Sequence, residues 1–360
     1  MKRLHLIIVS VIVLFCLQSC IDNDELFGEE IRHQLWLTND GADLPITIEG
    51  NNLQKRFCIL VHGGPGGSSQ EFNTFTSPFT DVIEEKYAMV YYDQRAAGIS
   101  KGIIKQETES IAQHVDDLDK VIDLLYFRYG ADISVALMGH SWGGYLTCAY
   151  LLDPQREAKV GTWVNIDGGV HRSNFLNDDM KRIVDIAQDE ILKGRFVNEW
   201  IELSNQAMAQ LDSNITLYTY QSQNQPFTIL SKAEQLINKS KVIETITGST
   251  FDAIYRNNYQ PFIAAANDNR SSQQVQEEMF QFDTTVEVLL PSVTLPTFNI
   301  YGYWDVRTAL QQGEYVFNTI ATPEDNKRLL ILEDSGHSPM VNEPVRLGDA
   351  IVEWLDEKLL

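Results

Sequence analysis

The sequence feature that most restricts the fold is a set of short, uninterrupted apolar runs, each followed by a glycine-containing turn. The runs are Phe57–Val61, Met89–Tyr92 and Val135–Met138. Apolar runs of this length without polar alternation are typical of strands that are buried on both faces. Between the second and third runs, Glu109–Tyr129 carries apolar residues at steps of three and four, which predicts an amphipathic helix. Strands that alternate with helices predict right-handed crossovers and a mostly parallel sheet.

The strand–helix alternation occupies two separate parts of the chain. Residues 30–169 and 291–360 form the predicted α/β core, and residues 170–290 interrupt it with helical patterns alone. A helical block inserted into a doubly wound sheet is the layout of a cap over a site. The other predicted elements are strands at 31–37, 44–49, 160–166, 297–301 and 328–332, and helices at 141–152, 180–192, 197–211, 232–246, 273–282 and 344–360.

Composition and charge exclude several other classes of protein. The 360 residues are 44% hydrophobic and 22% charged, with 22 Gly and 11 Pro, which argues against collagen, coiled coil and wholesale disorder. Asp and Glu number 50 against 28 Lys and Arg, for a net charge of −22. An acidic chain without a basic run repels phosphate backbones, so we expect no binding to nucleic acid.

The N-terminus is predicted to be a targeting segment outside the fold. A positive start at residues 1–3 precedes the apolar run Leu6–Leu17, which is short for a membrane span and ends before Ser19-Cys20. This pattern resembles a bacterial lipoprotein signal at residues 1–19, although Gln18 departs from the commonest form. The resemblance implies lipidation of Cys20, a tether at residues 20–29, and a place in the bacterial cell envelope, facing the periplasm or the surface. An uncleaved anchor helix and a plain secreted protein are the alternatives.

Two further cysteines, Cys58 and Cys148, lie within apolar stretches of the predicted core. Two thiols are too few for a disulfide framework, and neither has the spacing of a metal ligand. We therefore expect buried free thiols and no metal site.

The chain contains the pentapeptide Gly139-His140-Ser141-Trp142-Gly143, which fits the pattern G-x-S-x-G. A strand is predicted before it and a helix after it, as a nucleophile on a sharp strand-to-helix turn requires. Side chains two residues before and after the serine would collide at such a turn, which explains glycine at both positions. The positive end of the following helix would also face developing negative charge. Ser141 is the predicted nucleophile, and an ordinary structural turn is the alternative.

A serine nucleophile needs a base, and His337 is the favoured histidine. It follows the last predicted strand, where a loop can reach back over the carboxyl edge of the sheet. The other histidines have other expected places: His5 in the signal, His33 in the first strand, His62 in a glycine loop, His114 in the amphipathic helix, His140 beside the serine with its side chain pointing away, and His171 at the start of the cap.

The third member of a catalytic triad with serine and histidine must be an acid that fixes the imidazole tautomer. Asp305 follows the strand before His337 and completes the order serine, acid, histidine. Asp167 also ends a strand and is the alternative acid. Asp334 lies nearer to the histidine in sequence but precedes its turn, and we expect a structural role for it.

A glycine loop, His62–Gly67, follows the first buried strand. Glycine leaves backbone N–H groups bare, so the loop can face an oxyanion through Gly63 or Gly64, together with the N–H of Trp142. A phosphate loop is the alternative, but the Gly-Lys-Ser/Thr ending and the dinucleotide spacing are both missing. We therefore predict an oxyanion hole.

Together these motifs resemble the α/β-hydrolases, and most of all the proline iminopeptidase group of serine aminopeptidases. The resemblance rests on the runs HGGPGG at 62–67, DQRAAGIS at 93–100 and GHSWGG at 139–144, and on Asp305 and His337. It implies that Ser141 is the nucleophile, His337 the base and Asp305 the acid. Arg95 is expected to tie loops beneath the site.

The chain departs from that group at several positions. The group usually has Arg-Gly shortly after the sixth strand, where this chain has Asn165–Gly169, and Ala96 follows Arg95 where glycine is usual. The group carries cap glutamates that bind the free amine of the substrate, and Glu199 and Glu202 are the candidates here. The alternative is that they lie on a solvated helix face. Asp167 is a further candidate for substrate binding.

The predicted chemistry is hydrolysis of an amide or ester bond through an acyl-enzyme, with no cofactor. An aminopeptidase acting on short peptides is the favoured activity, and an esterase or lactonase with the same triad is the nearest alternative. An epoxide hydrolase or dehalogenase would carry aspartate in place of Ser141. A surface lipoprotein that binds a ligand without catalysis is the alternative from another class. The expected partners are a small molecule or short peptide, and a membrane through the N-terminal lipid alone.

Overall fold

The computed structural model of the chain describes residues 26–69, 72, 77–103, 105–212, 224–240 and 269–359. The predicted signal, Cys20, most of the tether and residues 241–246 of a predicted cap helix lie outside these ranges. No helix in the described ranges is both long and apolar enough to span a membrane.

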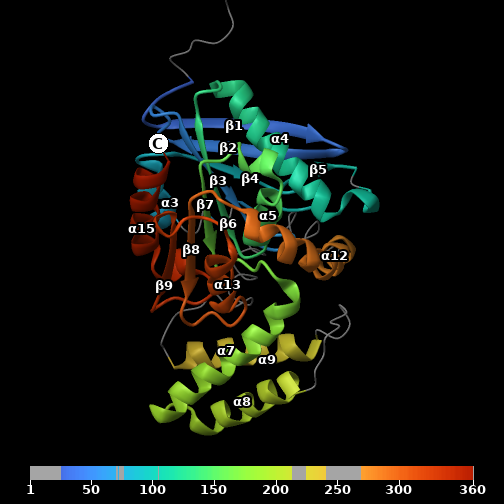
Figure 1. Ribbon diagram of the computed structural model, residues 1–360, viewed down its shortest axis with the longest axis vertical. Coiled ribbons are helices and arrows are strands. Elements are labelled where there is room, and N and C mark those ends of the chain that lie inside the picture. Colours follow the sequence, from blue (N-terminus) through green and yellow to red (C-terminus); the bar gives the residue numbers. More distant parts are fainter. Residues whose placement is uncertain are drawn as a thin grey trace, which may run out of the picture.

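A twisted sheet forms the centre of the molecule (Figure 1). Its nine described strands follow the order β1-β2-β4-β3-β6-β7-β8-β9, with β5 paired to β2. The three pairs that involve β2 are antiparallel. The other pairs, which follow the sheet order β4-β3-β6-β7-β8-β9, are all parallel. The mostly parallel sheet confirms the predicted α/β architecture. The strands are β1 (Ile31–Asn39), β2 (Ala42–Gly50), β3 (Arg56–Val61), β4 (Ala88–Tyr92), β5 (Lys101–Gly102), β6 (Ser134–His140), β7 (Thr162–Ile166), β8 (Thr297–Gly302) and β9 (Lys327–Leu332).

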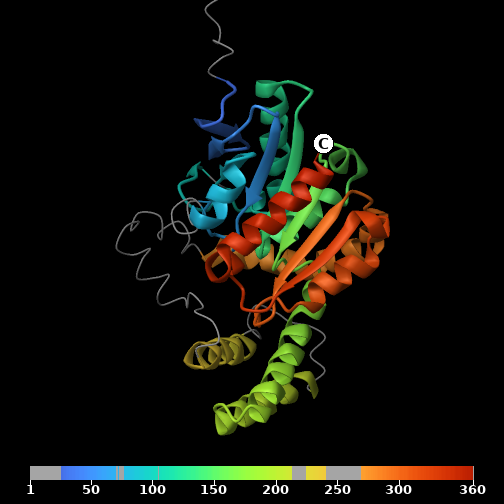
Figure 2. The same ribbon diagram turned by 90° about the vertical axis from the view of Figure 1, so that its left-hand side faces the viewer.

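The central strands are buried on both faces, which accounts for their uninterrupted apolar runs. In β3, Phe57 and Ile59 pack into one hydrophobic layer, whereas Cys58 and Leu60 pack into the layer on the opposite face. Cys148 belongs to the first layer, so the two buried thiols lie on opposite faces of the sheet. Figure 2 shows helices on both sides of the sheet. The first layer contains α4 (Ile111–Tyr129), α5 (Trp142–Leu151), α12 (Asn269–Leu289) and α13 (Gln311–Thr319), and the second contains α3 (Ser77–Glu84), α14 (Pro339–Asn342) and α15 (Pro344–Lys358).

Three helices of the segment between β7 and β8 form a separate cluster, at the bottom of Figure 1. They are α7 (Arg172–Leu192), α8 (Val197–Asp212) and α9 (Asn224–Lys239), and they enclose an apolar core around Trp200. Trp304 and Val306, which follow β8, pack into the same core. The three helices therefore lie over the carboxyl edge of the parallel strands, and we call them the cap helices.

Three elements of this segment differ from the sequence prediction. The helix α7 begins at Arg172 rather than at residue 180. The helix α9 begins at Asn224 rather than at residue 232. Pro226 is compatible with this start, because it lies in the first turn, where proline needs no hydrogen-bonded N–H. The helix α12 buries its apolar side chains in the first core layer and not in the apolar core of the cap helices, and the hydroxyl of Tyr145 on α5 donates to the carbonyl of Met279 at 3.1 Å.

Arg95 is buried beneath the carboxyl edge, as the sequence predicts. Its guanidinium donates to both carboxylate oxygens of Asp117 on α4, at 2.6 and 2.7 Å, and also to the carbonyl of Asn39 at 3.4 Å. Both side chains of the pair are at most 1% exposed. Arg95 thereby connects the loop after β4 to α4 and to the end of β1.

Replacing Arg95 with methionine is expected to lower the free energy of unfolding by about 3–5 kcal/mol, because the carboxylate of Asp117 would stay buried without its partner. Urea unfolding followed by circular dichroism measures the loss. The matched control is the double variant Arg95→Met/Asp117→Leu, which removes both charges and should recover much of the stability. A single variant as stable as the native protein would contradict this role for Arg95.

Candidate active site

Ser141 lies on a strained turn between β6 and α5. Its backbone has φ 57° and ψ −120°, a left-handed conformation that side chains other than glycine rarely adopt. A Cβ atom on Gly139 would lie 2.4 Å from the carbonyl oxygen of Gly143, and one on Gly143 would lie 1.9 Å from that of Val61. Glycine at both positions is therefore a steric requirement of this turn, as the sequence pattern predicts.

The structure brings Ser141, His337 and Asp305 together. His337 Nε2 lies 3.0 Å from Ser141 Oγ, and His337 Nδ1 lies 2.8 Å from Asp305 Oδ2. A carboxylate only accepts hydrogen bonds, so the Nδ1 atom carries the ring proton. The lone pair of Nε2 then faces the serine hydroxyl. This is the tautomer in which a histidine can take the serine proton.

The Asp305 carboxylate is held in place from two directions. Its Oδ1 atom accepts from the backbone N–H groups of Arg307 at 2.7 Å and Thr308 at 3.0 Å, which leaves Oδ2 for His337. The loops that carry the acid and the base are joined as well, since the N–H of Trp304 donates to the carbonyl of Ser335 at 2.9 Å. These bonds fix the carboxylate against the imidazole.

The two other candidate acids have other hydrogen-bond partners than the histidine. Asp167 follows β7 at φ 44°, is fully buried, and accepts the N–H of Gly302 at 2.8 Å through Oδ1. Its polar contacts are inside the protein, so the structure does not place it on a surface for substrate. Asp334 is exposed, and its backbone N–H donates to Glu343 at 3.1 Å. Of the three, Asp305 is the acid that contacts the histidine.

His140 does not point away from the site, contrary to the sequence expectation. Its Nε2–H donates to the backbone carbonyl of His337 at 2.8 Å, and the centres of the two rings are 5.1 Å apart. The tight turn at Ser141 brings this residue against the histidine loop. Burial, followed by the charge of His337, lowers the pKa of His140 to about 3, so its ring is neutral. His140 supports the backbone of the base, and only its position beside the serine could have indicated this.

Gly63 lies directly against the nucleophile. A Cβ atom at this position would be 3.2 Å from Ser141 Cβ and 3.4 Å from His140 Nδ1. Trp142, the other predicted source of an oxyanion N–H, is the first residue of α5. The glycine loop and the start of α5 therefore both adjoin Ser141, with Gly64 as the next residue of the loop.

Gln94 connects the glycine loop to the serine turn. Its side chain accepts from the Trp142 indole at 2.8 Å and donates to the carbonyl of His62 at 2.9 Å. The N–H of Gln94 also donates to His62 Nε2 at 3.1 Å, so the His62 proton is on Nδ1, facing the carbonyl of Gly63 at 2.8 Å. Burial is the main cause that lowers the pKa of His62, and the ring is a neutral structural group. The resemblance marked this glutamine as part of a motif without indicating these contacts.

Asp93 fixes the other end of the glycine loop. Its Oδ1 atom accepts from the hydroxyl of Ser68 at 3.0 Å and from the N–H and hydroxyl of Ser69 at 2.7 and 2.8 Å. Oδ2 accepts the N–H of Ile99 at 2.7 Å. Ala96 in the same turn has φ 54°, which explains why glycine is usual there in the group that this chain resembles.

The two cap glutamates lie away from the triad. Glu199 and Glu202 are exposed on α8, where they line a shallow groove of about 190 Å³ that also contains Lys232 and Lys239 from α9. The side chain of Gln206 donates to Glu202 at 3.0 Å. The structure therefore does not bring these carboxylates to Ser141.

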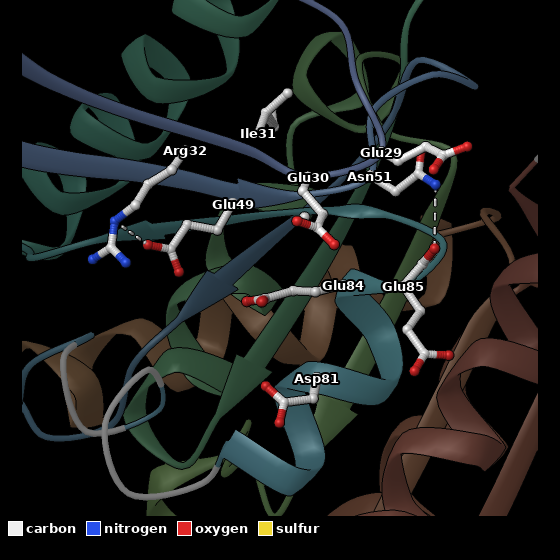
Figure 3. A pocket seen from close by; sticks show the side chains of 10 residues that line it. Glu29, Glu30, Ile31, Arg32, Glu49, Asn51, Asp81, Glu84 and Glu85 are labelled. Atoms are coloured by element: carbon white, nitrogen blue, oxygen red, sulfur yellow. Dashed lines mark hydrogen bonds and ion pairs between the residues drawn. The ribbon is translucent and has the colours of Figure 1, made fainter.

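A second groove, of about 750 Å³, is strongly acidic and lies at the opposite edge of the sheet (Figure 3). Gly50, which lines the groove, pairs with Ala88, the first residue of β4. The groove therefore lies at the amino ends of the parallel strands, whereas the triad lies at their carboxyl ends. Arg32 binds Glu49 at 2.8 Å, and the Tyr91 hydroxyl donates to Glu84 at 2.5 Å. The acidic side chains that line it are Glu29, Glu30, Glu49, Asp81, Glu84 and Glu85. No group of three possible metal ligands occurs here or elsewhere in the described part of the chain.

A histidine held between a buried carboxylate and a strained serine, on a mostly parallel sheet covered by helices, defines a serine hydrolase of the α/β-hydrolase fold. Residues 53–165 match the family described as "Serine aminopeptidase, S33". The protein is accordingly an enzyme of the α/β-hydrolase class, and the interpretation as a ligand-binding lipoprotein without activity is set aside.

Relatives of known sequence or structure agree with this class. A proline iminopeptidase of Saccharolobus solfataricus is 23% identical over 341 residues, which cover 92% of this chain and 91% of that protein. The crystal structure of a proline iminopeptidase from Mycobacterium smegmatis superposes with a TM-score of 0.60 at 16% identity, over 90% of this chain and 98% of that one. An esterase from Exiguobacterium antarcticum has a TM-score of 0.56 at 16% identity, over 90% and 100% of the two chains. The structural likenesses concern the fold alone.

Proposed function

We propose that this enzyme is a serine aminopeptidase of the proline iminopeptidase type, which releases the N-terminal residue of short peptides. The observation that carries the proposal is the contact of His337 with both Ser141 and Asp305, beside a glycine loop. The match to serine aminopeptidases at residues 53–165 and the nearly full-length likeness to a proline iminopeptidase favour a peptide substrate.

In the proposed reaction, Ser141 Oγ attacks the carbonyl carbon while His337 Nε2 takes the hydroxyl proton. The imidazolium is stabilised by Asp305. Backbone N–H groups of Gly63 or Gly64 and of Trp142 stabilise the oxyanion. His337 then gives its proton to the leaving amine, and an acyl-enzyme on Ser141 remains. Water, deprotonated by His337, releases the acyl group and restores the serine.

The substrate class is tested with paired substrates. Prolyl, alanyl and leucyl arylamides, their N-acetylated forms, and short- and medium-chain nitrophenyl esters are compared by kcat/KM, with the Ser141→Ala protein as the blank. We expect the free-amine arylamides to be cleaved and N-acetylation to lower kcat/KM by on the order of 10²-fold or more, because a site that binds a charged amine rejects its neutral analogue.

Turnover of the esters alone would contradict the aminopeptidase proposal and leave the triad in place. The substrate would then be an ester or a lactone, the alternative with which the esterase fold is compatible.

A further inference from the structure

Two buried aspartates follow neighbouring strands, and both contact the backbone of Gly302: Asp167 Oδ1 accepts its N–H, and the N–H of Asp305 donates to its carbonyl at 3.2 Å. Asp167 follows β7 and Asp305 follows β8, and these strands are neighbours in the parallel sheet. The N–H of Asp167 donates to the carbonyl of Ile300 at 2.9 Å, which sets it beside β8. Asp167 is 0% exposed and Asp305 is 1% exposed. Water therefore does not screen their interaction.

The hydrogen bonds of the two groups are unequal. Asp305 accepts three, from the N–H groups of Arg307 and Thr308 and from the ring of His337. Asp167 accepts one, from the N–H of Gly302 to Oδ1, and its Oδ2 atom has no donor among the described residues. A fully buried carboxylate oxygen without a donor is costly, whereas a protonated oxygen is itself a donor.

The titratable groups around the pair offer Asp167 no compensating cation. Arg307 points its side chain to Glu234 on α9, with one N–H···O distance of 2.7 Å. The hydroxyl of Tyr301 donates to the carbonyl of Gly168 at 2.5 Å, and burial is the main cause that raises its pKa well above the ordinary value. Cys148, also near Tyr301, is a buried thiol whose pKa is raised to about 12.

The remaining groups are His140, whose ring is neutral, and the acid and the base of the triad. His337 contacts Asp305 directly, so its positive charge during the reaction is matched by that carboxylate. Burial, and then the negative charge of Asp305, raise the pKa of Asp167 well above its ordinary value. A proton on Asp167 therefore turns its unpaired oxygen into a donor and also removes the repulsion between Asp167 and Asp305.

We propose that Asp167 is a neutral carboxylic acid that donates its O–H to the Asp305 carboxylate and so positions the acid of the triad. The proton stays on Asp167 throughout turnover, and no bond to it forms or breaks. The proposal rests on the proposed function in one respect, the assignment of Asp305 as the triad acid. Asp167 is thus a positioning residue. The acid after β8 contacts the histidine, and the acid after β7 supports it.

The test compares two substitutions that suit the left-handed backbone at this position, φ 44°. In Asp167→Asn, the amide can donate to Asp305 and accept from Gly302, as the neutral acid does. In Asp167→Gly, the donor is lost while the backbone is accommodated. The readout is the rate at which a fluorophosphonate labels Ser141, measured as a function of pH, together with kcat and KM on whichever substrate the native enzyme cleaves.

We expect Asp167→Asn to label and turn over within about 3-fold of the native enzyme. Asp167→Gly should lose roughly 10- to 100-fold in labelling rate and kcat, the worth of one hydrogen bond to a charged group, with KM little changed. Its acid limb should move to higher pH, because a carboxylate without the donor stabilises imidazolium more strongly. A Gly variant with native rates and an unchanged pH profile, or an Asn variant as slow as the Gly variant, would overturn the proposal.

Infrared difference spectra test the proton directly and do not depend on the Gly variant folding. At neutral pH the native enzyme should show the C=O stretch of a neutral carboxylic acid that Asp167→Asn lacks; spectra that do not differ in this band would overturn the proposal. Fluorophosphonate reacts whether the natural substrate is a peptide or an ester. A native enzyme that is labelled but cleaves no arylamide therefore refutes the aminopeptidase alone.

Discussion

Replacing Ser141 with alanine is expected to lower kcat/KM by about 10⁶-fold, down to the turnover that the oxyanion donors and binding alone provide. The substitution removes Oγ, the atom 3.0 Å from His337 Nε2, and leaves the backbone of the turn unchanged. Rates on the best substrate of the paired assay measure the effect, with fluorophosphonate labelling as a second readout.

The control is the thermal unfolding midpoint, which should stay close to that of the native protein because the lost hydroxyl is not part of the core. His337→Ala should lose a similar factor, and the double variant should be no slower than either single one, since the two residues act as a unit. Activity within 100-fold of the native level in Ser141→Ala would refute the nucleophile assignment.

Replacing Asp305 with asparagine is expected to lower kcat by about 10⁴-fold with little change in stability. The oxygen of the new amide would take the N–H bonds of Arg307 and Thr308 that Oδ1 now accepts. Its NH₂ group would then face His337 and force the ring proton onto Nε2, where it blocks proton transfer from Ser141. Steady-state kinetics over a range of pH measure the loss.

The matched control for this prediction is Asp167→Asn, an identical chemical change at the neighbouring strand end. The two variants should differ by about three orders of magnitude or more in kcat. If Asp167→Asn were the slower variant, Asp167 would be the triad acid, and Asp305 would take the supporting role.

The parallel core could be predicted from the sequence because its signals are local. A strand buried on both faces must be apolar at successive positions, as Phe57–Val61 is, and the layers on the two faces of β3 confirm that reason. The triad residues were found because each follows a strand, and parallel strands place such residues at one edge. The topology brings their loops to one edge, and the structure adds the contacts themselves, at 2.8 and 3.0 Å.

Other elements leave too little trace in the sequence. The helices α3 and α13 were not predicted, since 8 and 9 residues give barely two turns of periodicity. The orientation of the His140 ring depends on the geometry of the turn at Ser141, which cannot be predicted from the local sequence. The state of Asp167 depends on its neighbour across β7 and β8, at a separation in the chain where no local pattern exists.

The cap glutamates show the limit of carrying residues over from a resemblance. Glu199 and Glu202 occur in a segment with helical periodicity, which the structure confirms as α8, but periodicity does not tell which face of a helix looks toward the site. Both side chains are exposed, whereas Trp200 and Leu203 are buried in the core of the cap helices.

The packing of Trp304 and Val306 among α7, α8 and α9 sets the boundary of any unit that could be exchanged between relatives. A graft of residues 172–240 from another hydrolase would place foreign helices on two side chains next to Asp305. Such a chimera would have to carry its own counterparts of Trp304 and Val306 to keep the carboxylate in register. In this enzyme, the packing of the cap helices and the alignment of the triad carboxylate are therefore coupled, and a change inside the cap that leaves Trp304 and Val306 covered disturbs Asp305 less than a replacement of the whole cap.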